Sequence, residues 1–125
     1  MLNPYFSGFG DETGEGDGLG YNLNIPLKEG IKGTVYRKSL AKALEAIREY
    51  NPSYLIIALG LDIAKGDPTG TWLLSANDFQ ENGEMIAKMK IPTLVVQEGG
   101  YQNRVLGINA KHFFKASGKV ITWTN

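Results

Sequence analysis

The sequence predicts an α/β fold whose two central strands run parallel. Segments in which apolar residues recur at helical spacing alternate with short, continuous apolar runs, in the order helix, strand, helix, strand, helix. In such an alternation the helices are right-handed crossovers between parallel strands. The 125 residues, of which 42% are hydrophobic and 21% charged, suffice for one folded domain, residues 1–125.

The first third of the chain divides into an irregular segment and a helix. Residues 1–33 are rich in glycine and show no period typical of a helix or strand. Thr34 is the expected N-cap of a helix that runs to about Tyr50, where Asn51-Pro52 ends it. The apolar stripe of this helix consists of Tyr36, Leu40, Ala43, Leu44 and Ile47.

Two strands and two further helices complete the expected order. Residues 54–59 and 93–97 are apolar without alternation, which favours strands covered on both faces. Ser75 and Asp78 resemble a capping box at the start of a helix that ends near Met89. A third helix follows residues 98–101 and ends near Ala116, and residues 120–124 form either a short strand or a tail.

Composition excludes several classes of function. Lys plus Arg and Asp plus Glu both number 13, so the net charge is +0 and bulk charge does not favour nucleic acid binding. Without cysteine and with His112 as the one histidine, the chain has no disulfide, no cysteine nucleophile and no multi-histidine metal site. No targeting signal or membrane-length apolar run is present, so we expect a cytoplasmic protein without membrane contact.

Candidate functional residues follow the two expected strands. Ligands of open α/β sheets gather at the carboxyl ends of the strands, where residues 60–70 and 98–101 lie. Asp62 and Asp67 either ligate a divalent metal or turn the loop; spacing favours a turn for Asp62 and leaves Asp67 open. Tyr101, after two glycines, either stabilises negative charge on a ligand or is half-buried at a turn. His112 lies late on a helix, and we expect a surface or structural role.

Four segments, in this order along the chain, resemble the zinc-dependent histone deacetylase superfamily. They are GDETGEGDGLGYNLNIPL, GLDIAKGDPTG, PTLVVQEGGY and LGINAKHFF, and the first is most similar to the acetylpolyamine amidohydrolase branch. The resemblance covers about Asn3 to Phe114. It implies a partial three-layer α/β/α fold with a mainly parallel sheet, as in the C-terminal portion of arginase- and deacetylase-like domains.

The resemblance also implies site residues and a chemistry. Asp67 would be one of three zinc ligands, and Tyr101 would polarise the substrate carbonyl and stabilise the tetrahedral intermediate. Phe6 would line the acyl channel together with Gly99 and Gly100. The reaction would be the zinc-dependent hydrolysis of a small acetylated amine or of acetyl-lysine.

One departure from the family pattern limits these expectations. The family's Asp-x-His zinc ligands and its paired general-base histidines have no counterpart here. We therefore expect that this chain alone neither holds zinc stably nor catalyses hydrolysis, and that it is either a homo-oligomer or the partner of a missing N-terminal half. The alternative interpretation is a non-catalytic, self-assembling α/β domain.

Overall fold

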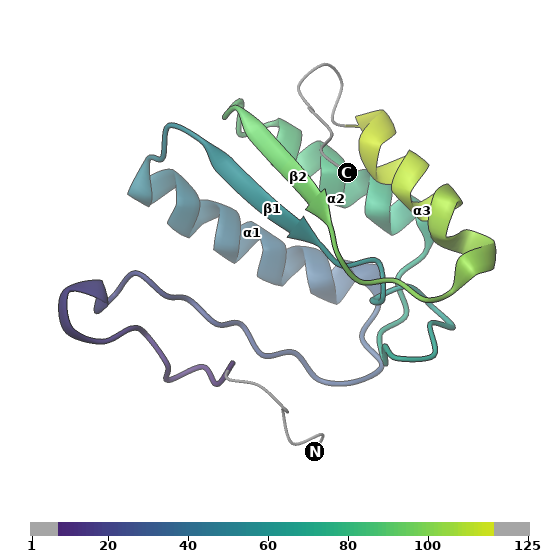
Figure 1. Ribbon diagram of the computed structural model, residues 1–125, viewed down its shortest axis with the longest axis horizontal. Helices are drawn as coiled ribbons and strands as arrows, with labels where there is room; N and C mark the ends of the chain where they lie inside the picture. The colour runs from purple at the N-terminus through teal and green to yellow at the C-terminus, as the bar shows by residue number, and fades with distance from the viewer. Residues whose placement is uncertain (1–7, 117–125) are drawn as a thin grey trace.

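The computed structural model describes residues 8–116 (Figure 1). The elements are a 3₁₀ turn η1 (Gly16–Gly18), α1 (Gly33–Tyr50), β1 (Leu55–Leu59), α2 (Ala76–Ala87), β2 (Thr93–Gln97) and α3 (Asn103–Ala116). The order is the predicted one. The possible terminal strand at residues 120–124 lies outside the described residues. None of the helices in the described part is long and apolar enough to cross a membrane.

The two strands form a parallel sheet, as the alternation of elements predicts. Leu55 lies opposite Thr93 and Leu59 opposite Gln97, so the strands pair over their full length. The connection through α2 is the crossover that parallel pairing requires. Both strands end at the same side of the molecule, where the two candidate loops begin (Figure 1).

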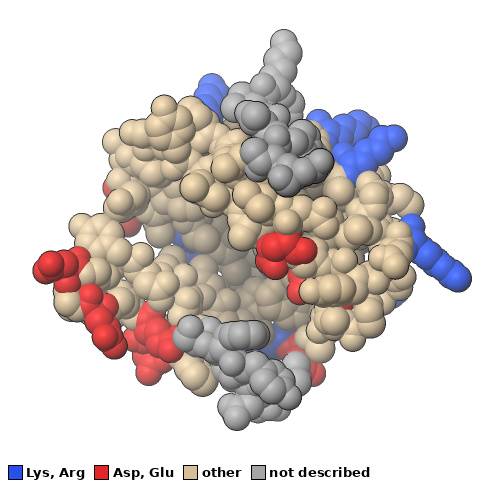
Figure 2. Space-filling view, in the orientation of Figure 1, with Lys and Arg blue, Asp and Glu red and all other residues tan. Residues whose placement is uncertain are grey.

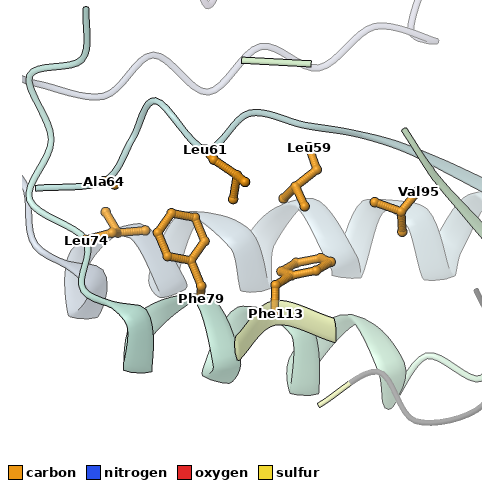
Figure 3. Close-up of a cluster of buried hydrophobic side chains, with 7 residues drawn as sticks. All are labelled: Leu59, Leu61, Ala64, Leu74, Phe79, Val95 and Phe113. Atoms are coloured by element: carbon orange, nitrogen blue, oxygen red, sulfur yellow. The ribbon is translucent and has the colours of Figure 1, made fainter. Parts of the chain in front are cut away.

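The hydrophobic core lies between one face of the sheet and the helices (Figure 3). Phe79 of α2 and Phe113 of α3 are 1% and 3% exposed, and they pack in one cluster with strand residues Leu59 and Val95. Tyr36 of α1 packs against the same cluster. All three helices therefore cover the same sheet face, and residues 8–116 form two of the three layers that the resemblance implies.

The prediction that both strands are covered on both faces was wrong. Exposure alternates along β1, where Ile56 is 71% exposed, and Val96 of β2 is 39% exposed. The register places Ala58 opposite Val96, so both lie on the face that no helix of residues 8–116 covers. Figure 2 shows mostly uncharged residues on this side of the molecule, with one group of Asp or Glu atoms near its middle. The continuous apolar run thus places apolar residues on both faces of the sheet, and residues 8–116 cover one of these faces.

The helix termini agree with the sequence at α2 but not at α1. Ser75 and Asp78 form the predicted capping box, with the Asp78 carboxylate accepting from the Ser75 N–H at 2.8 Å. By contrast, α1 starts at Gly33 after an extended Lys32, so Thr34 lies inside the first turn and is not the N-cap. Gly33 packs against Asp78, where a Cβ would overlap the carboxylate, so the helix begins at a position that has no room for a side chain. Asn51, in the left-handed conformation, ends α1 as expected.

Candidate functional site

The loops that follow β1 and β2 are joined backbone to backbone. The Glu98 N–H donates to the Leu59 carbonyl at 3.1 Å, and the Leu61 N–H donates to the Gly99 carbonyl at 3.0 Å. These bonds extend the β1–β2 pairing beyond the strands. They bring Asp67 and Tyr101 to one rim of the sheet, as expected for loops at the carboxyl ends of neighbouring parallel strands.

The Asp67 carboxylate is the polar centre of this rim. Its Oδ1 accepts from the backbone N–H and the hydroxyl of Thr69, at 2.9 and 2.8 Å. Its Oδ2 accepts from the backbone N–H groups of Tyr101 and Gln102, at 2.7 and 3.0 Å. The residue is 6% exposed. One buried carboxylate therefore binds the two loops together with four hydrogen bonds.

These hydrogen bonds determine the charge of Asp67. Burial by itself raises the pKa of the carboxyl group, but the donated bonds from Tyr101, Thr69 and Gln102 outweigh burial and lower the pKa to about 2. The group is therefore an anion at neutral pH. A buried anion at the carboxyl end of a parallel sheet has the charge and the place of a cation ligand.

Tyr101 is held by its backbone and presents its side chain to solvent. The residue is 58% exposed, while its N–H is bound to Asp67. The preceding Gly100 has a φ of +125°, and a Cβ there would lie 2.8 Å from the Leu61 Cβ and 2.7 Å from Leu106 Cδ1. A side chain at position 100 would therefore be both strained and crowded. The glycine allows the sharp turn that directs Tyr101 away from the core.

Asp62 supports the loop, as its spacing favours. A Cβ at position 99 would lie 3.1–3.2 Å from the atoms of the Asp62 carboxyl group, and Gly99 is buried. A Cβ at Gly70 would overlap the Asp62 carbonyl oxygen. Glycines therefore let the backbone close around Asp62 from two sides.

A catalytic zinc ion needs more ligands than the described part of this chain brings together. Such sites use three protein ligands drawn from histidine, cysteine and carboxylates, and no cluster of three such residues exists in residues 8–116. The four hydrogen bonds of Asp67 also fill the four acceptor positions of its carboxylate. A metal would have to displace one donor, and the Thr69 hydroxyl can rotate away most easily. The residues of this chain by themselves do not fit the metal.

Three of the predicted site residues stay predictions, and two residues of the site were not predicted from the sequence. Phe6 lies outside the described residues, and the structure does not test the channel role of Gly99 and Gly100. Thr69 was missed, although Asp-Pro-Thr is a typical sequence for an Asp side chain that binds the N–H two residues on. Gln102 was also missed, and no local signal marks it; besides donating to Asp67, its side chain donates to the Gly66 carbonyl at 2.9 Å.

His112 has no place in the hydrogen bonds of this rim. It lies on α3, and its Nδ1 is buried without a hydrogen-bond partner in the described part of the chain. The structural role expected from the sequence is therefore not that of a fully satisfied side chain. The residue that holds the rim together is Asp67.

Comparison with known proteins identifies the class to which this fold and rim belong. The family model of the histone deacetylase domain matches residues 2–117. Acetylpolyamine amidohydrolase of Burkholderia pseudomallei (strain 1710b) is 36% identical over 115 residues, which are 92% of this chain and 34% of that protein. Acetylpolyamine amidohydrolase 1 of Pseudomonas aeruginosa is 43% identical over 107 residues, 86% of this chain and 31% of that protein.

A solved structure agrees with the sequence comparison. The crystal structure of the acetylpolyamine aminohydrolase from Burkholderia pseudomallei superimposes with a TM-score of 0.89 at 35% identity, over 96% of this chain and 35% of that one. The chain belongs to the histone deacetylase family. It spans about a third of the length of the curated relatives that it matches.

Proposed function

We propose that this chain supplies one part of an amide deacetylase site that acts on small acetylated amines, such as acetylated polyamines, or on acetyl-lysine. The observation that carries the proposal is the junction of Asp67 with the backbone of Tyr101 at the carboxyl end of the sheet. The similarity to two acetylpolyamine amidohydrolases supports the amine substrate class. The remaining ligands and the general base would come from outside this chain.

Tyr101 carries the chemistry that this chain can contribute directly. Hydrolysis of an amide passes through a tetrahedral intermediate whose oxygen becomes negative. A hydroxyl that is already oriented toward this oxygen stabilises it by a hydrogen bond without reorganisation during the reaction. The exposed Tyr101 side chain, fixed at its N–H by Asp67, is suited to this task.

Asp67 has two tasks in this proposal. Its negative charge at neutral pH would attract a cation to the rim, which could bind the carboxylate only by displacing a donor such as the Thr69 hydroxyl. Its hydrogen bonds fix the backbone from which Tyr101 projects. Catalytic zinc, when bound by a complete ligand set, polarises a carbonyl and activates water. Because one carboxylate is not the three-ligand set that catalytic zinc takes, the contribution of Asp67 by itself is limited to anchoring and orientation.

A chimeric enzyme tests the proposal. This chain replaces the matching third of the Burkholderia pseudomallei acetylpolyamine amidohydrolase, and release of acetate from an acetylated polyamine is measured. We expect zinc-dependent turnover that falls about 100-fold or more in Tyr101→Phe, the size typical of a lost oxyanion donor. Tyr50→Phe, at the far end of α1, is the matched control and should keep full activity. A folded chimera whose turnover is the same with and without the Tyr101 hydroxyl would contradict the proposal.

A second candidate is a non-catalytic domain that assembles with itself. The exposed apolar side chains of Tyr54 and Ile56, 76% and 71% exposed, favour it because such a face is suited to association. Light scattering at micromolar concentration separates the candidates. A stable symmetric dimer in which the face is buried, together with an inactive chimera, would support this second function.

A further inference from the structure

Gln102 lies at the junction between the loop after β1 and the first turn of α3. Its N–H donates to Asp67 Oδ2 at 3.0 Å, and its side-chain Nε2 donates to the carbonyl of Gly66 at 2.9 Å. Its own carbonyl accepts from the N–H groups of Val105 and Leu106, at 3.0 and 3.1 Å, where α3 begins. Gln102 therefore binds the loop after β1 at two adjacent residues and also binds the start of the helix.

The side-chain bond is the contact of Gln102 that depends on the type of residue. Every residue except proline offers a backbone N–H and a carbonyl, whereas the contact with Gly66 needs a donor at the end of a side chain of this length. Gly66 has a φ of +84°, a left-handed conformation that favours glycine, and its carbonyl meets this donor. A glutamine amide supplies the donor without adding a charge beside the Asp67 anion. The amide of Gln102 is thus suited to a specific task at the rim.

Asp67 holds both peptide groups that flank the Cα of Tyr101. A peptide group is planar, so an N–H that is bound restricts the orientation of the whole group. The N–H of Tyr101 belongs to the group before its Cα, and the N–H of Gln102 belongs to the group after it. Both donate to Asp67 Oδ2, at 2.7 and 3.0 Å. The direction in which the Tyr101 side chain leaves the backbone therefore depends on the position of one carboxylate oxygen.

The side-chain bond of Gln102 keeps this oxygen in place relative to Tyr101. Gly66 directly precedes Asp67, so the Gln102 amide holds the backbone that carries the carboxylate, while the Gln102 N–H holds the carboxylate itself. Two attachments to neighbouring residues oppose rotation of the loop about either bond. Packing restrains Tyr101 only weakly, because its side chain is 58% exposed and Gly100, with a φ of +125°, precedes it. Loss of the amide should therefore let Tyr101 move.

We propose that Gln102 is a positioning residue: its side chain, bound to the Gly66 carbonyl, holds Tyr101 in the orientation in which the tyrosine hydroxyl meets the substrate carbonyl oxygen. This inference deepens the proposed function and rests on the role given there to Tyr101. A hydroxyl that stabilises a developing negative charge is effective when it is oriented in advance. A displacement of about 1 Å at a reacting centre can lower a rate about 100-fold. Gln102 thus acts through Tyr101 and not on the substrate.

Measurements on the 125-residue chain test the positioning without catalysis. The six tyrosines are replaced by a ring-fluorinated tyrosine, and the fluorine resonance of Tyr101 is assigned as the signal missing from Tyr101→Phe. Gln102→Met keeps the length of the side chain and removes the donor. We expect the Tyr101 resonance to shift toward that of a free peptide. We also expect amide exchange at Tyr101 to become about tenfold faster, as for the loss of one hydrogen bond.

Two further variants are matched to Gln102→Met. Gln97→Met makes the same substitution at the exposed end of β2, and neither readout should change. Gln102→Asn keeps the amide but is shorter by one methylene, so its donor does not reach Gly66 and it replaces Gln102→Met if that variant does not fold. Circular dichroism shows which variants are folded. A folded Gln102 variant whose Tyr101 resonance and exchange equal those of the native chain would overturn the proposal.

The chimeric enzyme then tests whether the positioning acts on catalysis. We expect Gln102→Met to lower kcat about tenfold or more and to change KM less than about twofold, because the tyrosine acts in the transition state. In the Tyr101→Phe chimera the same substitution should change kcat less than about twofold, because no hydroxyl is left to position. Equal losses in the two backgrounds would overturn the proposal. A chimera insensitive to Tyr101→Phe, combined with a shifted resonance in the isolated chain, would contradict the proposed function alone.

Discussion

The backbone N–H of Tyr101 donates to the carboxylate of Asp67 at 2.7 Å, across 34 residues of sequence. This bond joins the loop after β1 to the loop after β2. It means that the anion and the tyrosine of the rim share one rigid support. A change at Asp67 is therefore expected to alter both the stability of the fold and the place of the Tyr101 side chain.

The first prediction concerns the stability that Asp67 provides. Asp67→Ala leaves the donors of Thr69, Tyr101 and Gln102 without their acceptor, so we expect the free energy of unfolding to fall by about 2–4 kcal/mol. Urea denaturation measures this loss. Asp17→Ala, in the exposed η1 turn, is the control and should change the free energy by less than about 0.5 kcal/mol. An equal effect of the two substitutions would show that the carboxylate does not hold the loops.

The second prediction concerns acid. The pKa of Asp67 is about 2 in the folded chain against an ordinary value of 3.8. A pKa that folding lowers stabilises the fold above the ordinary value, and this stabilisation is lost as the pH falls through the folded value. The difference in unfolding free energy between the native chain and Asp67→Asn should therefore shrink from about pH 4 toward pH 2.

The pKa of Asp78 is also lowered in the folded chain, so Asp78 makes its own contribution to the pH dependence of the unfolding free energy. This contribution must be separated from that of Asp67. Burial raises the pKa of Asp78, but the bonds from Arg37 and Ser75 outweigh burial and lower it. Because Asp67→Asn retains this group, its contribution cancels in the difference between the two proteins. Urea titrations at several pH values supply the measurement. A difference that stays constant down to about pH 2 would refute the assignment to Asp67.

The third prediction compares two glycines. A Cβ at Gly70 would overlap the carbonyl oxygen of Asp62, so Gly70→Ala should destabilise the chain by about 2 kcal/mol or more and displace the loop. A Cβ at Gly107 in α3 would have no neighbouring atom within 4 Å, and Gly107→Ala should stabilise the helix by about 0.5–1 kcal/mol. Thermal denaturation gives both values. Effects of the same sign would contradict the packing around Asp62.

The fourth prediction concerns the junction of α1 and α2. Arg37 pairs with Asp78 at 2.7 Å and with Glu81 at 2.8 Å, and the side chains of Arg37 and Asp78 are 20% and 17% exposed. We expect Arg37→Met to lower the free energy of unfolding by about 1 kcal/mol, and less at high salt. Lys38→Met, one residue away and exposed, serves as the control. A loss that does not respond to salt would mean that packing, not charge, is responsible.

Local sequence patterns predicted the order of helices and strands because the formation of each element depends mainly on residues that are neighbours in the sequence. The Ser75–Asp78 capping box and the end of α1 at Asn51 are of this kind. The start of α1 is not of this kind, since the helix begins at Gly33, which packs against Asp78, 45 residues away. No local pattern contains that contact. The sequence therefore points to Thr34, a residue type typical of N-caps, two positions beyond the observed N-cap Lys32.

Some features of the candidate site could likewise be predicted from local sequence, whereas others depend on contacts between distant residues. Paired glycines predicted the sharp turn before Tyr101, and the order of elements predicted that its loop would meet that of Asp67. The anchoring of the carboxylate by Gln102 depends on the tertiary structure and has no sequence signal. The exposure of Ile56 was not predicted. A run of apolar residues indicates that a strand is suited to burial on both faces, but it does not indicate whether the residues that cover it belong to the same chain.

The central claim is that Asp67 and Tyr101 belong to a deacetylase site that this chain holds only in part. Hydrolysis of an acetylated polyamine by the isolated 125-residue chain, with zinc present, tests it most directly. We expect acetate release no faster than in buffer, because residues 8–116 hold one candidate ligand where catalytic zinc takes three. Zinc-dependent turnover by the chain alone that disappears in Asp67→Ala would show that the site is complete, and would contradict the claim.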